Sequence, residues 1–288
     1  MLVMGSVIGV GIFAVPHDIA GLVHTRALIL IAWVVGGVIS LSGSLVYADL
    51  SRRRPLVGGQ YAYLRDAYHP VVGFLYGWCL LCVIQSGGIA SVAVVFARYV
   101  VEIGSIFAAH DPAAGAPVAK RVVAAVAIAS LTGLNCLGVR TGSTAQNIFM
   151  VLKILAIGTL ILAGLLVMPL QDDPPGSEGP SPSSERAVVP ALAAALVPVL
   201  FSYGGWHTTT FMAAEVADVR RNLPLGLVFG VTGVTALYLG VNFACVRVLG
   251  ADRLAASDHP ASDVMRQALG APGVAFISAG IAVSPLAF

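Results

Sequence analysis

Long apolar runs recur along the chain and are separated by short polar stretches. A helix needs about 20 mostly apolar residues to cross the hydrocarbon core of a bilayer. Inside that core every backbone N–H and C=O group must be satisfied within the protein, so such runs fold as spanning helices. The sequence therefore predicts an all-α membrane protein. The predicted spans, roughly eight in number, cover residues 1–21, 27–50, 71–107, 121–139, 145–169, 189–214, 222–248 and 271–288.

The low content of charged residues supports this class and excludes some partners. Only 10% of the residues are charged, whereas soluble domains carry about 25%. The formal net charge of +2 provides no basic surface for nucleic acid, so the lipid bilayer is the expected partner. The Cys79-x-x-Cys82 spacing lies in an apolar run, and we interpret both cysteines as small packing residues. No metal site and no cofactor are expected.

Glycines interrupt the first apolar run. Gly5, Gly9 and Gly11 lie within residues 5–13, although glycine costs about 1 kcal/mol relative to alanine in a helix interior. Glycine lets the backbone leave helical geometry, and free N–H groups at membrane depth are tolerated only where they meet protein, a cavity or a ligand. The interruption therefore indicates half of a small-molecule site. The alternative is that the glycines only permit close helix packing.

The sixth apolar run is interrupted as well, by Pro198 and then by Ser-Tyr-Gly-Gly at residues 202–205. Two interrupted runs five spans apart are typical of inverted-repeat transporters, which bind their substrate near the bilayer midplane. We interpret the chain as one transmembrane permease domain with a first repeat over residues 1–169 and an incomplete second repeat over residues 189–288. The acidic, Pro/Ser-rich stretch 170–188 between them is expected to be a disordered external loop.

Dense arginine clusters suggest the orientation. They occupy residues 52–54, between the second and third spans, and residues 220–221, between the sixth and seventh. Counts of Lys and Arg do not separate the two sides of the membrane. The positive-inside rule applied to these counts therefore does not decide the orientation. We expect the two clusters in the cytoplasm because they are dense and adjoin span ends.

Several stretches together resemble a known family. They read Gly-Val-Gly-Ile-Phe (residues 9–13), Tyr-Ala-Asp-Leu (47–50), Gly-Gly-Gln-Tyr-Ala-Tyr-Leu-Arg (58–65), Gly-Phe-Leu-Tyr-Gly-Trp (73–78), Phe-Ser-Tyr-Gly-Gly-Trp (201–206), and Glu-Val followed by Arg-Asn-Leu-Pro (215–224). With them the chain resembles the amino acid permeases of the amino acid–polyamine–organocation superfamily, closest to the L-type and related exchangers. Val10 replaces the usual serine, and Asp218-Val219 replaces the usual Asn-Pro.

The resemblance implies a fold, an activity and a location. The fold is the LeuT-like inverted-repeat transporter fold, with discontinuous first and sixth helices. Since that family has twelve spans, about 8 of 12 are expected here, and the chain is expected to be a fragment without the last four. The implied activity is sodium-independent amino acid transport by alternating access, as an exchanger or a proton-coupled carrier. The implied location is the cell (plasma) membrane, with an amino acid as substrate.

The resemblance also implies a substrate site at the two interruptions. In such proteins the α-carboxylate binds like an anion at a helix N-terminus, here the N–H groups near residues 10–12. The ammonium binds carbonyl oxygens freed where a helix ends. Val10 removes one hydroxyl from the usual motif but no backbone donor. The predicted substrate-binding residues are Val7, Gly9, Val10, Gly11, Ile12, Phe201, Ser202 and Gly204.

Other side chains are candidates for the walls of the site. The resemblance makes Phe201 an apolar gate over the substrate, although a single aromatic in a span is usually core or lipid-facing. Gln85, Tyr203 and His207 are possible pocket residues, and for His207 a hydrogen-bonded structural role is an equal alternative. Asp49 and Glu215 are a possible inner gate, although exposed pairs of this kind contribute only about 0–1 kcal/mol.

Lys153 is the most specific single residue, because it lies inside the fifth apolar run. A charge in the membrane is costly and indicates a functional site. The alternative is that the long side chain reaches an interface. In sodium-independent relatives a lysine at the matching place substitutes for a sodium ion. The resemblance therefore implies that Lys153 bonds carbonyls around residues 5–8 and takes the place of the coupling ion.

Other functions remain open at the level of sequence. The chain is also compatible with a truncated, non-transporting relative, either a fragment or a structural partner, and with a polyamine or organocation carrier of the same superfamily. An enzyme is not expected, because the six histidines are scattered among loops and different spans. The transported amino acid, antiport against proton symport, and an accessory subunit are not determined by these residues.

Overall fold

The computed structural model describes residues 2–9, 11–54, 58–108, 116–136, 139–167, 185–216 and 218–283. These residues form helices, and no strand occurs among them, so the all-α prediction is confirmed for this part of the chain. The helices long and apolar enough to cross a membrane are Arg26–Arg53, Pro70–Ala97, Gln146–Leu166, Val188–Phe211 and Val219–Ala256. The count of eight spans and the LeuT-like fold stay predictions.

The described helices follow one another along the chain. Their bounds are α1 (Leu2–Val7), α2 (Gly11–Val23), α3 (Arg26–Arg53), α4 (Gly59–Ala67), α5 (Pro70–Cys79), η1 (Leu80–Gln85), α6 (Ser86–Ala108), α7 (Ala116–Cys136), α8 (Val139–Leu162), η2 (Ala163–Val167), α9 (Glu185–Ser202), η3 (Trp206–Glu215), α10 (Val219–Ala256) and α11 (Pro260–Val283). Residues 170–184 of the predicted loop lie outside the described residues. Its last residues, 185–188, belong to α9, which begins at Glu185.

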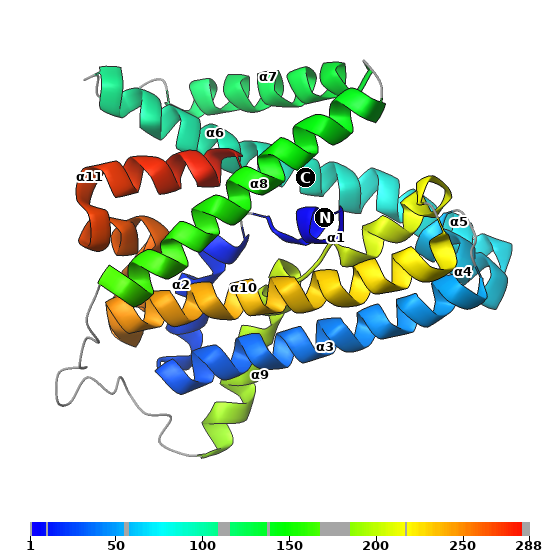
Figure 1. Cartoon of the computed structure of the whole chain (residues 1–288), viewed down its shortest axis with the longest axis horizontal. Helices are drawn as coiled ribbons and strands as arrows, with labels where there is room; N and C mark the ends of the chain where they lie inside the picture. Colours follow the sequence, from blue (N-terminus) through cyan, green and yellow to red (C-terminus); the bar gives the residue numbers. More distant parts are fainter. Residues whose placement is uncertain are drawn as a thin grey trace.

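The two long helices α3 and α10 lie side by side along much of their length (Figure 1). Helix α9 crosses α3, and α1 and α2 pack against α10. Two adjacent glycines of α3 allow this close packing. A Cβ added at Gly36 would overlap Val199 of α9, and one added at Gly37 would lie 2.5 Å from a methyl carbon of Thr235 of α10. Small residues bring helix backbones together in this way in membrane bundles.

Glycines with positive φ bend the second half of the chain. Gly250 (φ 75°) and Gly270 (φ 67°) interrupt α10 and α11. A left-handed conformation of this kind is easily adopted only by glycine. The bend at Gly270 adjoins residue 271, where the last apolar run begins.

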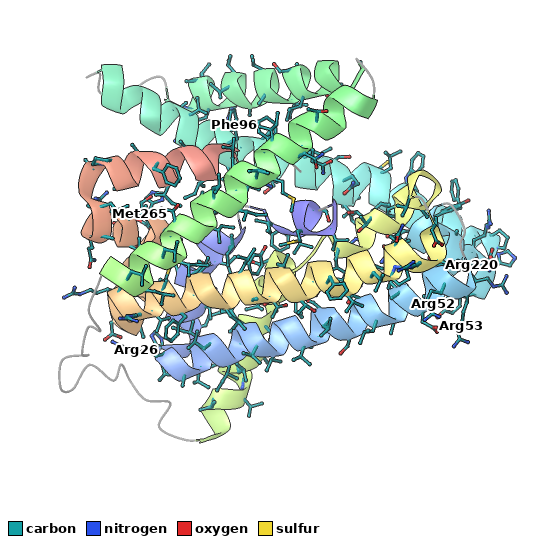
Figure 2. The ribbon with its side chains drawn as sticks, viewed as in Figure 1. Arg26, Arg52, Arg53, Phe96, Arg220 and Met265 are labelled. Atoms are coloured by element: carbon teal, nitrogen blue, oxygen red, sulfur yellow. The ribbon has the colours of Figure 1, made fainter. Side chains whose placement is uncertain are left out.

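Arginines mark one end of the long helices. Figure 2 shows Arg52, Arg53 and Arg220 together at this end, which we call the arginine end, and Arg26 at the opposite end. The three side chains are exposed. Helices α4 and α5 also lie at the arginine end (Figure 1). The two clusters noted in the sequence thus share one end of the bundle, and its assignment to the cytoplasm stays a prediction.

Replacing Gly36 by alanine should destabilise the bundle. The new Cβ would overlap Val199 and lie 3.3 Å from the ring of Tyr203, and overpacking of a core costs about 1–3 kcal/mol. The measurement is thermal unfolding of the purified protein in detergent. Gly158→Ala in α8 is the matched control, because its Cβ meets nothing within 4 Å. Equal melting temperatures for the two variants would contradict the packing described for α3.

Candidate functional site

The first break separates α1 from α2. The N–H of Ile8 makes the last bond of α1, to the carbonyl of Met4 at 2.9 Å, and Gly9 lies outside both helices. Helix α2 then begins at Gly11. The first N–H groups of a helix and its last carbonyls have no partner within it. The break therefore brings free acceptors and free donors close together. Val10 lies outside the described residues.

The second break separates α9 from η3. Helix α9 ends at Ser202, and the turn over residues 203–205 ends at Gly205, whose φ is 102°. The following η3 is a 3₁₀ helix. Three successive threonines favour it, because their hydroxyls donate to carbonyls three residues back, at 2.6 Å in each case. These pairs are Thr208 to Gly205, Thr209 to Trp206, and Thr210 to His207.

The two breaks touch each other through glycines. A Cβ at Gly205 would overlap the carbonyl oxygen of Ser6, in the last turn of α1. A Cβ at Gly11 would lie 2.8 Å from the hydroxyl of Ser202, the last residue of α9. The end of α1 thus meets the start of η3, and the start of α2 meets the end of α9. At Gly205 the approach of the Ser6 backbone leaves no space for a side chain, whereas at Gly11 a Cβ would meet the Ser202 side chain.

Tyr238 of α10 joins the breaks chemically. Its hydroxyl lies 3.0 Å from the carbonyl oxygen of Val7 and 3.1 Å from that of Ser202. These are the last residues of α1 and α9. Tyr238 is 0% exposed, so both contacts are shielded from solvent within the described chain. One side chain thereby ties the ends of two helices that are far apart in the sequence.

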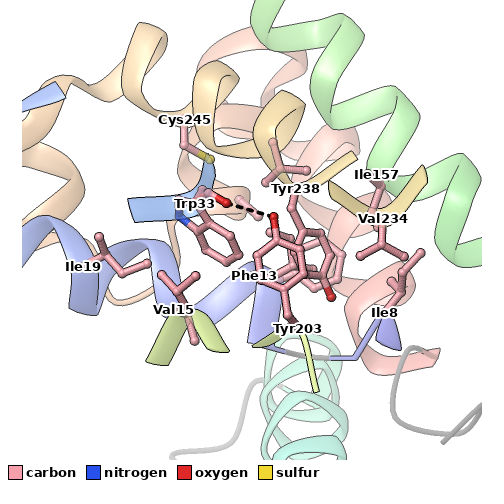
Figure 3. Close-up of a cluster of buried hydrophobic side chains, with 14 of the residues drawn as sticks. Ile8, Phe13, Val15, Ile19, Trp33, Ile157, Tyr203, Val234, Tyr238 and Cys245 are labelled. Atoms are coloured by element: carbon pink, nitrogen blue, oxygen red, sulfur yellow. Dashed lines mark hydrogen bonds between the residues drawn. The ribbon is translucent and has the colours of Figure 1, made fainter. Parts of the chain in front are cut away.

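An aromatic cluster supports Tyr238, as Figure 3 shows. The rings of Trp33, Tyr203 and Tyr238 pack against one another with centroid separations of 5.1–5.8 Å. The hydroxyl of Tyr203 donates to the carbonyl of Trp33 at 3.1 Å. Tyr203, predicted as a possible pocket residue, is buried in this cluster. Its ring therefore holds α3, α9 and α10 together.

Lys153 reaches the first break from α8. Its Nζ atom donates to the carbonyl of Ile8 at 2.7 Å, and the side chain is 1% exposed. The ammonium thus points into the protein and does not extend along α8 to an interface. A buried charge is costly unless it is paired or hydrogen-bonded. The freed carbonyl at the end of α1 supplies that partner, so a positive charge lies at the break.

The remaining predicted pocket residues are more dispersed. The Phe201 side chain is 80% exposed, and its carbonyl accepts from the N–H of Gly204 at 3.0 Å. His207 is half-buried in η3 beside Trp206, at a centroid separation of 5.7 Å. Gln85 ends η1, which packs chiefly against α5 and α6. Ile12, in contrast, is fully buried at the start of α2.

The predicted inner gate is not brought together by any described contact. Asp49 forms an exposed ion pair of 2.8 Å with Arg53, one turn along α3. Glu215 is the last residue of η3, and its side chain lies outside the described residues.

The part of the chain that the structure describes contains no group of three or more His, Cys, Asp or Glu residues that could hold a metal ion.

Comparison with known proteins identifies the family. The family model described as amino acid permease matches residues 1–288. The chain belongs to the amino acid permease family.

Individual relatives agree with this assignment. The b(0,+)-type amino acid transporter 1 of Homo sapiens is 30% identical over 253 residues, which cover 88% of this chain and 50% of the relative. The large neutral amino acids transporter small subunit 2 of Homo sapiens is 30% identical over 274 residues, covering 93% and 50%. The permease chain thus spans about half the length of the curated relatives it matches. Family and apolar helices together make it an integral membrane protein.

Sequence reasoning missed Tyr238 and Trp33 of this permease. A signal for Tyr238 was available, since it lies well inside the seventh apolar run. A phenol at membrane depth needs a hydrogen-bond partner. The interruptions in the first and sixth runs were the obvious places to look for free carbonyls. Which carbonyls it meets, however, depends on how α10 packs.

Replacing Tyr238 by phenylalanine should loosen both breaks. The ring contacts remain, but the carbonyls of Val7 and Ser202 lose a buried donor, at a cost of about 1–3 kcal/mol. We expect faster amide hydrogen exchange over residues 2–9 and 203–206, measured by mass spectrometry. Tyr68→Phe removes a hydroxyl from an exposed tyrosine and is the control. Unchanged exchange at both breaks in the Tyr238 variant would show that its hydroxyl does not hold them.

Proposed function

We propose that this permease is a secondary transporter that moves amino acids across the plasma membrane by alternating access, independently of sodium. The observation that carries the proposal is the meeting of the two breaks at Tyr238, with the Lys153 ammonium on the first break. The names of the relatives, which describe amino acid transporters, support the class of substrate. The division of the chain into a first repeat over residues 1–169 and an incomplete second repeat over residues 189–288 is part of this proposal.

The N-terminus of α2 suits the substrate carboxylate. Its first N–H groups have no partner within the helix, and the helix dipole places partial positive charge there. The proposed donors belong to Gly9, Val10, Gly11 and Ile12. The missing side chain at Gly11 lets the start of α2 lie close to Ser202, whose hydroxyl would be only 2.8 Å from a Cβ there. An anion binds at such a helix end without needing a basic side chain.

The ends of α1 and α9 suit the substrate ammonium. The proposed acceptors are the carbonyls of Val7, Phe201, Ser202 and Gly204. The single O–H of Tyr238 is shared between the carbonyls of Val7 and Ser202, and each carbonyl oxygen has a second lone pair for another donor. A zwitterion thus finds donors at the start of one helix and acceptors at the ends of two others. Phe201, Gln85 and His207 are proposed as the residues nearest the substrate side chain.

Lys153 supports sodium independence. A sodium ion at such a break binds freed carbonyl oxygens, and the ammonium at 2.7 Å from the Ile8 carbonyl already supplies a cation there. This cation is covalently attached, so its presence needs no ion gradient. We propose the arginine end as the cytoplasmic end, with Asp49 and Glu215 near the inner gate.

Counterflow into proteoliposomes tests the function. The panel contains labelled amino acids and polyamines, with sodium or choline as the only external cation. We expect accumulation of one or more amino acids to the same extent in both buffers. A requirement for sodium would remove the proposed role of Lys153. Accumulation of polyamines alone would indicate an organocation carrier, and no accumulation by folded protein would indicate a non-transporting relative.

Replacing Gly11 by valine should abolish uptake while membrane insertion persists. The new Cβ would lie 2.8 Å from the Ser202 hydroxyl, and the added methyls would fill the space proposed for the carboxylate. Overpacking of about 1–3 kcal/mol predicts a loss of counterflow of roughly fivefold to more than a hundredfold at about 1.4 kcal/mol per factor of ten. Gly21→Val is the control, because nothing lies within 4 Å of its Cβ. Normal counterflow by the Gly11 variant would contradict the proposed carboxylate site.

Replacing Lys153 by methionine should impair transport. The variant keeps most of the side-chain volume but leaves the Ile8 carbonyl without its buried donor, which costs about 1–3 kcal/mol. We expect counterflow to fall about tenfold, or sodium to become stimulatory. Lys120→Met in α7 removes a positive charge elsewhere and should leave counterflow unchanged. Equal activity of the two variants would contradict a role for the Lys153 ammonium.

A further inference from the structure

We propose that Gln60 is a positioning residue for transport, because it fastens α4 over η3 and so holds the α1–η3 side of the breaks closed at the arginine end. The inference rests on the proposed function, since it assigns a role to the packing around the same site. The contacts that support it are those of α4 at the arginine end, and not those of the two breaks. Gln60 lies in α4, between the second and third predicted spans.

The side-chain amide of Gln60 connects three helices. Its Nε2 donates to the hydroxyl of Tyr47 in α3, and its Oε1 accepts from the hydroxyl of Tyr76 in α5. The amide thus donates to one tyrosine hydroxyl and accepts from the other, whereas a carboxylate in its place could bond both only by accepting from the two hydroxyls. All three side chains are partly buried. The amide therefore fixes α4 against the ends of two spanning helices.

Helix α4 in turn lies directly on η3. Gly59, the neighbour of Gln60, has φ 48°, and a Cβ there would overlap the Thr210 hydroxyl and lie 3.2 Å from the backbone nitrogen of Phe211. This backbone-to-backbone contact needs glycine for its conformation and for its space. Any displacement of η3 toward α4 is therefore transmitted to α4 at once. Gln60, the next residue along the chain, opposes this displacement of α4 through its hydrogen bonds to Tyr47 and Tyr76.

Aromatic rings fill the rest of the contact. The ring of Tyr47 packs edge-to-face on Trp206, the first residue of η3, with 5.1 Å between centroids. A Cβ at Gly43 of α3 would lie 2.9 Å from the same indole. Burial, together with neighbouring Tyr47, raises the pKa of Tyr63 on α4 above its ordinary value. The contact between α3, α4 and η3 is thus apolar, and the Gln60 amide provides its directional bonds.

Helix η3, the element that α4 covers, depends on contacts with neighbouring helices. The hydrogen bonds of a 3₁₀ helix have poorer geometry than those of an α-helix, and η3 extends over ten residues. Besides α4, η3 packs against α1, α3 and α10. Opening the breaks toward the arginine end requires α1 and η3 to leave this arrangement. Such a movement either separates η3 from Gly59 or carries α4 along and breaks the contacts of Gln60.

Hydrogen exchange on the full chain tests the fastening directly. Gln60→Met keeps the size of the side chain and removes both hydrogen bonds, whereas Gln60→Glu keeps acceptors for the hydroxyls of Tyr47 and Tyr76. We expect amides of residues 59–67 and 206–215 to exchange at least about threefold faster in Gln60→Met, with rescue in Gln60→Glu. Tyr47→Phe and Tyr76→Phe should each reproduce part of the effect. Tyr68→Phe, on an exposed tyrosine of the same segment, should not.

Two exchange results would overturn the proposal. One is unchanged exchange over residues 206–215 in Gln60→Met, which would mean that the amide does not hold η3. The other is an equal acceleration in the buried part of α10, residues 231–249, which would make Gln60 a general stability residue. Neither result depends on transport, so a failure of the proposed function is distinguishable from a failure of this inference.

A transport measurement adds the functional readout. If Gln60→Met populates the form open at the arginine end, less protein presents its site at the opposite end. The apparent half-saturating concentration from that opposite side should then rise by at least about threefold, because apparent affinity falls with the competent fraction. Gln60→Glu should restore it. An unchanged half-saturating concentration beside an unchanged exchange rate would leave no role for Gln60 in transport.

Discussion

The carbonyl oxygens released where α1 and α9 end are the constraint on which the rest of this structure depends. Helices that stop at membrane depth leave polar backbone groups that neither lipid nor the helices themselves can satisfy. Here Tyr238 meets the carbonyls of Val7 and Ser202, and Lys153 meets the carbonyl of Ile8. Both side chains come from helices that are continuous at these positions, α10 and α8. Uninterrupted neighbours thus supply donors to the carbonyls at the ends of the interrupted helices.

The helices could be anticipated from the sequence more fully than their shapes. Apolar runs locate helices because the cost of an unsatisfied backbone in lipid depends only on length and hydrophobicity. The 3₁₀ form of η3 depends instead on three threonine hydroxyls acting on nearby carbonyls, a local competition that hydropathy does not register. Likewise, Gly270 looks like any other glycine until its φ of 67° is seen. The packing of α4 on η3 joins segments about 150 residues apart, and no local pattern encodes it.

In the candidate site, too, some features could be predicted from the sequence and others could not. The glycines of both breaks could be predicted because they are costly in a helix and need a reason. A lysine in an apolar run stood out for its charge, whereas Tyr238 did not, because a tyrosine is acceptable in a core or near an interface. Side-chain exposure escaped prediction altogether. Phe201 and Ser202 are adjacent, yet the first is 80% exposed and the second is buried against the breaks.

The contacts also differ in how easily they can be exchanged. Gly205 lies against the backbone of Ser6, and Gly11 lies against the side chain of Ser202, so neither contact depends on a hydrogen bond. The bonds of Tyr238, Lys153 and Gln60 are directional and few, and each contributes only about 0.5–3 kcal/mol net. A bistable element needs differences of a few kcal/mol between its states. Under the proposed function, α1 and η3 can therefore move as one unit against α3 and α10, because a small number of replaceable hydrogen bonds set the equilibrium of the motion.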